Sequence, residues 1–188
     1  SDWRITPKVT LLSGVRMDNH NLVDKPIFSP RASLMYTYKE NTQIRFSFGT
    51  GFRAPQAFDT DLHLAFAGGG ISRISLSPDL KHERSRSYST SINYDKAMEK
   101  WIAGYTIEGF YNQLKDAFYL EPIGQDQFGE RFEKRNGSGA VVKGFTVEAR
   151  ANYNAQVQVE SGFTLQTSRF DDEVEYIDGL PGIRDFIR

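Results

Sequence analysis

The sequence predicts an all-β protein, built as an antiparallel up-and-down meander of about seven long strands. Three observations support this class: apolar and polar residues alternate with a period of two, the alternating segments are long, and short connections alternate with long ones. The segments typically exceed ten residues, whereas a globular strand usually has about five or six and a tilted strand across a bilayer needs about nine to eleven. We therefore predict a transmembrane β-barrel.

The first three strands are predicted at residues 4–16, 28–38 and 42–52. Pro7 interrupts the first, and we expect a bulge or an edge position there because proline cannot donate a ladder hydrogen bond. Apolar residues share one side of these strands: Ile5, Val9, Leu11 and Val15, then Ala32, Leu34, Tyr36 and Tyr38, then Ile44, Phe46 and Phe48. The residues between them are mostly polar, so each strand has one apolar side and one polar side.

Four further strands are predicted at residues 83–95, 100–113, 139–153 and 155–168. The first of these places five small polar residues on one side: Ser85, Ser87, Ser89, Ser91 and Asn93. Such a row cannot form a core. Charged residues on the polar sides of the strands are expected to face a lumen and to hydrogen-bond across its wall; these are Arg45, Glu108, Glu148, Arg150 and Glu160.

The connections between the strands differ in length in a regular way. Short turns are expected at residues 39–41, at residues 96–99 and around Asn154, and long connections at residues 18–27, 53–81 and 114–138. Outer-membrane barrels alternate short periplasmic turns with longer extracellular loops. The connections therefore favour a meander that crosses a membrane.

Aromatic residues gather beside the short turns, on the apolar side of their strands: Trp3, Tyr36, Tyr38, Tyr94, Trp101 and Tyr153. Tryptophan and tyrosine form belts of this kind at the interface between membrane and water. A soluble sandwich gives no reason to place its aromatic residues at one end. This girdle is the feature that favours the membrane barrel over a soluble sheet.

Composition excludes several other classes of protein. Lys+Arg 23 against Asp+Glu 24 gives a net charge of −1, so no nucleic-acid partner is expected. The absence of cysteine excludes disulfides and thiolate metal sites, and a membrane helix is excluded because no run of about 18 apolar residues exists. The first residues, Ser1 to Thr10, do not resemble a signal peptide. No grouping of Ser, His and an acid has a spacing that supports catalysis, so we expect neither an enzyme nor a cofactor.

Three segments carry motifs of a known protein family. The stretch Gly49-Thr50-Gly51-Phe52-Arg53-Ala54-Pro55-Gln56 is similar, nearly letter for letter, to the strand exit of the TonB-dependent outer-membrane receptors. The stretch from Ser77 to Ser85 resembles the entry to the next strand, with His82 in place of the usual proline and Ser77 in place of asparagine. The stretch from Asn136 to Glu148 resembles a strand that opens after a loop.

This resemblance, over residues 3–170, implies that residues 1–188 are part of a 22-stranded β-barrel in the bacterial outer membrane. It also implies a plug domain ahead of this chain and coupling to TonB, although neither a plug nor a TonB box is visible in the sequence. The implied partners are outer-membrane lipid, the protein's own plug with TonB beyond it, and a nutrient at the extracellular loops.

Four residues are candidates for ligand contact. Arg53 has two interpretations: it faces the lumen near the outer rim, or, as the simpler one has it, the motif's two glycines and Pro55 only shape the strand exit. Asp59, Asp61 and His63 follow at a period of two in the longest connection. Such spacing could gather oxygen and nitrogen ligands on one side of an extended segment. Polar loops also contain such triplets by chance, so no metal site is assigned.

Three functions fit these features. The first is TonB-driven uptake of a scarce large nutrient such as a ferric siderophore, cobalamin or a glycan. The second is a passive, porin-like barrel, which the alternation alone allows and the three motifs oppose. The third is a soluble all-β binding module, which would bury one side of its strands against a second sheet.

Overall fold

A computed structural model describes residues 1–21, 23–55, 73–127 and 129–171, which form eleven strands. The main sheet has eight strands in the order β1 (Asp2–Thr6), β2 (Val9–His20), β3 (Val23–Lys39), β4 (Thr42–Arg53), β6 (Glu83–Ala97), β7 (Trp101–Lys115), β10 (Ala140–Tyr153) and β11 (Val157–Phe170). A second sheet has the order β5 (Arg73–Leu76), β9 (Gly129–Asn136) and β8 (Phe118–Asp126).

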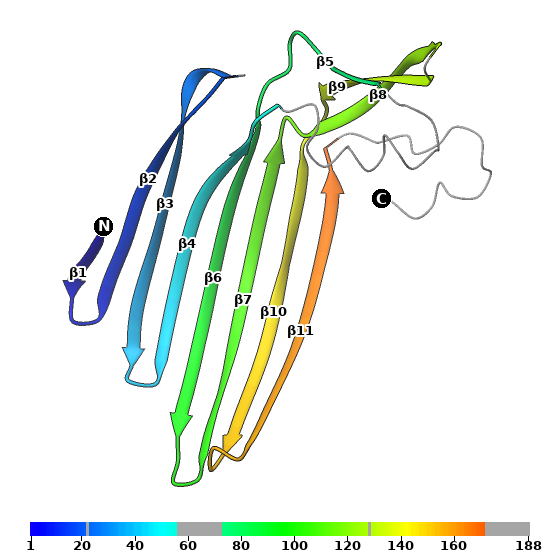
Figure 1. The fold of residues 1–188 in the computed structure, drawn as a ribbon. Coiled ribbons are helices and arrows are strands. Elements are labelled where there is room, and N and C mark those ends of the chain that lie inside the picture. The colour runs from blue at the N-terminus through cyan, green and yellow to red at the C-terminus, as the bar shows by residue number, and fades with distance from the viewer. Residues whose placement is uncertain (22, 56–72, 128, 172–188) are drawn as a thin grey trace.

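The predicted antiparallel meander is confirmed. Every neighbouring pair in the main sheet is antiparallel, and the sheet is one curved layer with β5, β8 and β9 at one end (Figure 1). We call this end the loop end and the opposite one the turn end. The pairing of β7 with β10 runs without a shift from Trp101–Tyr153 to Leu114–Ala140. An unshifted register keeps each side of one strand beside the same side of the next.

The register therefore produces two faces of different chemistry. The apolar face carries the row Ile44, Ile92, Ile107, Val147 and Phe163, whose members pair in turn across five strands. The polar face is the opposite side. Among the described residues Ile27 alone is a buried hydrophobic residue, while Phe163 is 60% exposed. The main sheet thus has no core of its own, and its apolar face needs an apolar surrounding.

The prediction of a single strand at residues 4–16 is wrong, because two strands occupy this stretch. Pro7 and Lys8 form a turn that separates β1 from β2, and the pairing is irregular just before it, between Arg4 and Thr6. Proline fits a turn because its fixed φ and missing N–H cost nothing there. The additional turn lies at the turn end, beside the other short turns (Figure 1).

One of the expected long connections is shorter than predicted. The connection at 18–27 is a tight hairpin, because β2 continues to His20 and β3 begins at Val23. The connection expected at 114–138 is long, as predicted, and it contains the hairpin of β8 and β9. Only β5 is described within 56–76, since residues 56–72 lie outside the described ranges.

The three short turns at the turn end occur where they were expected. In the last of them, Asn154 and Ala155 have φ values of 49° and 55°, a left-handed backbone that matches the twist of hairpin strands. The side-chain Oδ1 of Asn152 accepts the N–H of Ala155 at 2.9 Å. The described part of the chain contains no helix long and apolar enough to cross a membrane.

Candidate functional site

The three motif segments meet at the loop end, although the first ends at residue 56 and the third begins at residue 136. Arg53 is the last residue of β4 and Glu83 is the first of β6, and the register pairs them directly. Their contact is bidentate, with Nε to Oε2 at 2.7 Å and Nη2 to Oε1 at 2.8 Å. Glu83 is only 5% exposed. The planar fork of arginine matches a carboxylate, so this pair joins the ends of the two strands firmly.

Glu83 also holds the start of β8. Its Oε1 accepts the backbone N–H of Phe118. The ring of Phe118 lies beneath two cations, since Arg53 Cζ and Lys134 Nζ are each 5.0 Å from its centre. Lys134 is 1% exposed. The carboxylate of Glu83 and the aromatic face together offset the desolvation of Arg53, and the same aromatic face lies against the buried cation of Lys134.

Asn136, from the third motif, ties the second motif to the end of β7. Its Nδ2 donates to the carbonyls of Lys81 and Asp116 at 2.9 and 2.8 Å, and its Oδ1 accepts the N–H of Lys81 at 2.7 Å. We call Arg53, Glu83, Phe118, Lys134 and Asn136 the rim cluster. The rim cluster fixes the places where two long connections leave the main sheet.

His82 borders the rim cluster. Its ring meets Phe52 edge to face, with centroids 6.3 Å apart and planes at 86°. Partial burial and the positive charge of Arg84 lower the pKa of His82, and the carboxylate of Asp116 opposes this shift. The histidine that replaces the usual proline is therefore more readily kept neutral than a free histidine.

The structure places one of the four candidate ligand residues. Arg53 is on the polar face, and its Nε and Nη2 are held by Glu83. Asp59, Asp61 and His63 lie outside the described residues. Within the described ranges, no three His, Asp or Glu side chains are grouped so as to hold a metal ion.

Sequence reasoning missed the partner of Arg53. The signal was available, because two strands joined by a long connection and paired antiparallel bring the last residue of one beside the first of the next. Applied to β4 and β6, that rule places Arg53 opposite Glu83. No comparable signal pointed to Phe118, which reaches the site from the second sheet.

Arg150 makes a second charge contact on the polar face. Its Nε and Nη2 bind Asp95 at 2.8 and 2.6 Å, and its Nη1 donates to Thr106 Oγ1 at 3.0 Å. Arg150 is on β10 and Asp95 on β6, so the pair reaches across β7 at Gly104, which is paired with both residues. The expected hydrogen bonding of Arg150 across this wall is confirmed.

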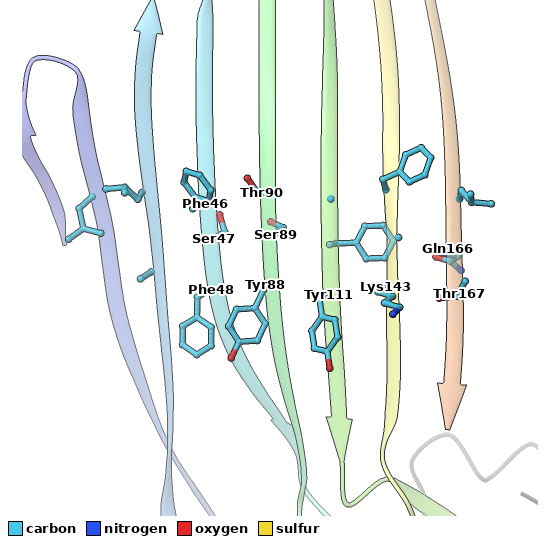
Figure 2. Close-up of a pocket in the computed structure, with 18 residues that line it drawn as sticks. Phe46, Ser47, Phe48, Tyr88, Ser89, Thr90, Tyr111, Lys143, Gln166 and Thr167 are labelled. Atoms are coloured by element: carbon cyan, nitrogen blue, oxygen red, sulfur yellow. The ribbon is translucent and has the colours of Figure 1, made fainter. Parts of the chain in front are cut away.

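The apolar face carries aromatic rows at two levels. Beside the turns, Trp101 and Tyr153 have ring centroids 4.8 Å apart, and Tyr94 and Tyr105 are 5.3 Å apart. A second row, toward the loop end, contains Phe48, Tyr88 and Tyr111, with successive centroids 5.1 and 6.3 Å apart. The expectation that aromatic residues gather at the turn end only is wrong, because Phe48, Tyr88 and Tyr111 form a second row toward the loop end (Figure 2).

The spacing of the two rows matches a membrane. On β7, the first row contains Trp101 and Tyr105 and the second contains Tyr111, so the outermost pair is Trp101 and Tyr111. Ten residues at about 3.4 Å each give about 34 Å along the strand. A strand tilt of about 40° reduces this to about 26 Å, close to the apolar band of about 25 Å in outer-membrane barrels.

A sequence profile described as "TonB dependent receptor-like, beta-barrel" matches residues 1–184. No curated protein matches the chain significantly.

Several solved structures share the fold at low identity. The FrpB iron transporter from Neisseria meningitidis (F3-3 variant) is 21% identical with a TM-score of 0.62, over 88% of this chain and 24% of that one. The siderophore receptor PirA from Pseudomonas aeruginosa is 17% identical with a TM-score of 0.63, over 90% and 39%. A mutant ferric enterobactin receptor from Pseudomonas aeruginosa, in complex with enterobactin, is 16% identical with a TM-score of 0.54, over 86% and 31%.

This chain thus spans 24% to 39% of the length of those proteins. The likeness of fold covers most of the chain, and the profile covers nearly all of it. The chain belongs to the TonB-dependent receptor family, within the β-barrel domain that spans the outer membrane in that family.

Proposed function

We propose that this chain is a segment of the barrel of an active importer in the bacterial outer membrane, which takes up a scarce large nutrient by coupling to TonB. Residues 1–188 form one part of a single barrel of 22 strands. The observation that carries the proposal is the membership of the family together with the separation of a polar and an apolar face. Such a sheet fits a wall between lipid and an aqueous lumen.

The polar face has the properties of a lumen wall that meets a plug. Arg150, Asp95 and Thr106 form a hydrogen-bonded network there, and the row of serines on β6 leaves space beside it. Small polar side chains permit a second domain to approach closely and to bond to the wall. The protein's own plug, and TonB through it, are the partners that this face fits.

Ferric siderophores are the nutrient class that the structural neighbours favour. FrpB is described as an iron transporter and PirA as a siderophore receptor. Cobalamin and glycans are the other members of the nutrient class proposed from the sequence. The extracellular connections, including Asp59, Asp61 and His63, would make the first contact, with Arg53 at their base.

The test uses the complete protein that carries this chain, expressed from its own gene. Cells are fractionated, and the protein in the outer membrane is examined for a folded form that migrates differently on a gel before and after heating. Uptake of a panel of ferric siderophores, of cobalamin and of glycan fragments is then compared between cells with and without the gene, each with and without TonB.

Recovery in the outer membrane, heat-dependent migration and uptake that requires both the gene and TonB are the expected results. Uptake that persists without TonB would indicate a passive porin instead. Recovery in the water-soluble fraction would support the soluble binding module and remove the membrane placement. If cells without the gene lose uptake of cobalamin or glycans instead of siderophores, the protein is still an importer, but its nutrient is not a siderophore.

A further inference from the structure

The asparagine of the rim cluster is followed directly by a glycine, and Asn136-Gly137 is the only such pair in the sequence. We propose that this pair is a site of spontaneous deamidation, which the assembled rim keeps unreactive and which reacts when the rim opens. The product cannot restore the rim, so the modification proceeds in one direction. The proposal goes beyond uptake and rests on the rim cluster alone, whatever the protein imports.

Asparagine before glycine can close a ring on its own backbone. The backbone nitrogen of Gly137 gives its proton to a base in solvent and attacks Cγ of Asn136, so that a bond from this nitrogen to Cγ forms and the bond from Cγ to Nδ2 breaks. Nδ2 takes a proton from solvent and leaves as ammonia, and a cyclic succinimide remains. Water then opens either side of the ring and gives aspartate or isoaspartate. Glycine favours ring closure because it has no side chain to obstruct the nitrogen and its backbone rotates freely.

The folded rim occupies the groups that the reaction uses. Nδ2 of Asn136, the leaving group, donates to the carbonyls of Lys81 and Asp116 at 2.9 and 2.8 Å, and Oδ1 accepts the N–H of Lys81 at 2.7 Å. The N–H of Gly137, which must lose its proton, donates to the carbonyl of Ala117 at 2.7 Å. Gly137 itself is exposed, so water and a base can reach the pair once these contacts are released.

The backbone at Asn136 also opposes ring closure. Asn136 is the last residue of β9 and pairs with Phe118 of β8. An extended backbone turns the next nitrogen away from the side chain, so the ring can close only after a rotation that breaks this pairing. Phe118 is held in turn by Glu83, whose Oε1 accepts its N–H. The stability of the rim cluster therefore controls how often Asn136 becomes reactive.

Packing and hydrogen bonding explain why a reactive pair occupies this place. A Cβ at Gly137 would be 3.0 Å from Cδ1 of Tyr119 and 3.4 Å from its Cε1, so any larger residue requires the ring to shift. Tyr119 is 45% exposed, which gives the ring room to do so. Asn136 serves two carbonyls and one N–H at once, a combination that needs both donors and an acceptor in one short side chain.

The products of deamidation cannot serve the same three groups. Aspartate at position 136 has acceptor oxygens and no donor, so the carbonyls of Lys81 and Asp116 lose their partner and face a negative charge instead. Isoaspartate places a side-chain carbon in the main chain, which lengthens the connection between β9 and β10. A molecule that has reacted therefore keeps a loosened rim.

The test follows deamidation in the complete protein, purified in detergent and incubated at mildly alkaline pH. Peptides are prepared at acidic pH, which suppresses further reaction, and chromatography with mass spectrometry measures the aspartate and isoaspartate forms at position 136. We expect the folded protein to react at least twentyfold more slowly than the same protein unfolded in guanidinium chloride. Gly137→Ala, also unfolded, should react at least tenfold more slowly than the unfolded wild type, because its methyl group obstructs the nitrogen.

Variants connect the reaction to the rim. Glu83→Gln weakens the hold on Phe118 and should speed deamidation of the folded protein at least threefold. Glu108→Gln is the matched control and should react as the wild type does, because Glu108 is on β7, outside the rim cluster. Asn136→Asp has the same side chain as one product and should unfold at a lower concentration of denaturant. Its control is Asn112→Asp, an exposed position on the polar face, which should unfold as the wild type does.

Three results would overturn the proposal. Equal rates in the folded and unfolded protein would show that the rim does not protect Asn136, and an unchanged rate in folded Glu83→Gln would show that opening of the rim does not control the reaction. An Asn136→Asp variant as stable as the wild type would show that the product restores the rim. If Glu83→Gln does not fold, the comparison of folded with unfolded wild-type protein decides the matter. Cell fractionation and uptake, which test the proposed function, are independent of all these results.

Discussion

The carboxylate of Glu83 connects three parts of the chain. It binds the guanidinium of Arg53 and accepts the backbone N–H of Phe118, and thereby joins β4, β6 and β8. A buried carboxylate with such partners is costly to lose, because the groups that remain are left desolvated. The rim of the sheet therefore depends on one residue more than on any of the exposed charges around it.

Replacing Glu83 by glutamine tests this dependence. Glu83→Gln keeps the shape of the side chain and removes its charge, so we expect the free energy of unfolding to fall by about 1–3 kcal/mol. Thermal unfolding of the complete protein in detergent, followed by circular dichroism, measures the loss. Glu108→Gln is the control, since Glu108 is half-buried on the polar face and pairs with no cation among the described residues. Equal losses in both variants would contradict the role of Glu83.

His82 gives the rim a dependence on pH. The pKa of His82 is lower in the folded protein than the ordinary 6.5, because of burial and then of Arg84. The unfolded chain therefore binds more protons than the folded chain at pH values just below 6.5, so stability falls as the pH drops through this range. This loss of stability is complete once the pH is well below the pKa that His82 has in the folded protein.

Unfolding of the complete protein between pH 7.5 and 5 measures this effect. We expect the wild-type protein to lose stability over the range, and His82→Gln to lose less, because glutamine does not titrate. The difference between the two curves isolates His82 from the other groups that titrate. Parallel curves would show that protonation of His82 has no influence on the rim.

Gly104 shows how one strand permits a contact between its neighbours. Arg150 on β10 reaches Asp95 on β6 across the space that a side chain at position 104 would fill. A Cβ there would be 2.2 Å from Asp95 Oδ1 and 2.4 Å from the carbonyl oxygen of Tyr94. The backbone oxygen cannot swing away as a side chain can, so the glycine is required by packing.

Gly104→Ala should therefore lower the free energy of unfolding by about 1–3 kcal/mol, as overpacking does elsewhere. The matched control is Gly49→Ala on β4, since a Cβ at Gly49 meets nothing within 4 Å. We expect that control to change stability by less than about 0.5 kcal/mol. Chemical denaturation of the complete protein in detergent would compare the two, and equal effects would refute the packing argument.

Strand existence was predictable where alternation is long, and strand ends were not. Six of the seven predicted segments correspond to β3, β4, β6, β7, β10 and β11. The first segment divides at Pro7, because alternation continues through the turn and hides it. The extension of β3 back to Val23 was hidden by Pro26, which argues against a strand.

The second sheet could not be predicted, for a different reason. β5 pairs with β9 in parallel, and the two are separated by more than 50 residues. Charged residues such as Glu130, Arg131 and Glu133 resemble a solvated loop, whereas the structure places them on β9. Pairing between distant short segments leaves little trace in local periodicity. The same holds for Phe118, whose role at the rim cluster depends on that pairing.

The two faces of the main sheet imply different surroundings for neighbouring side chains. Phe163 and Thr164 are adjacent on β11, both are exposed, and they point to opposite faces. Phe163 is in the row with Ile107, between the two aromatic rows, while Thr164 bonds to Thr146 at 2.9 Å. In a barrel, one would face lipid and the other the lumen.

Lysine at each position in turn tests this assignment. Phe163→Lys should lower the free energy of unfolding by about 2–4 kcal/mol, since a charge near the middle of the apolar band must leave water. Thr164→Lys should cost less than about 1 kcal/mol, which corresponds to one exposed hydrogen bond. Refolding of the complete protein into lipid vesicles, followed by heat-dependent migration on gels, compares the folded fractions. Equal losses would mean that the apolar face is covered by protein rather than by lipid, and a larger loss in Thr164→Lys would reverse the assignment of the two faces.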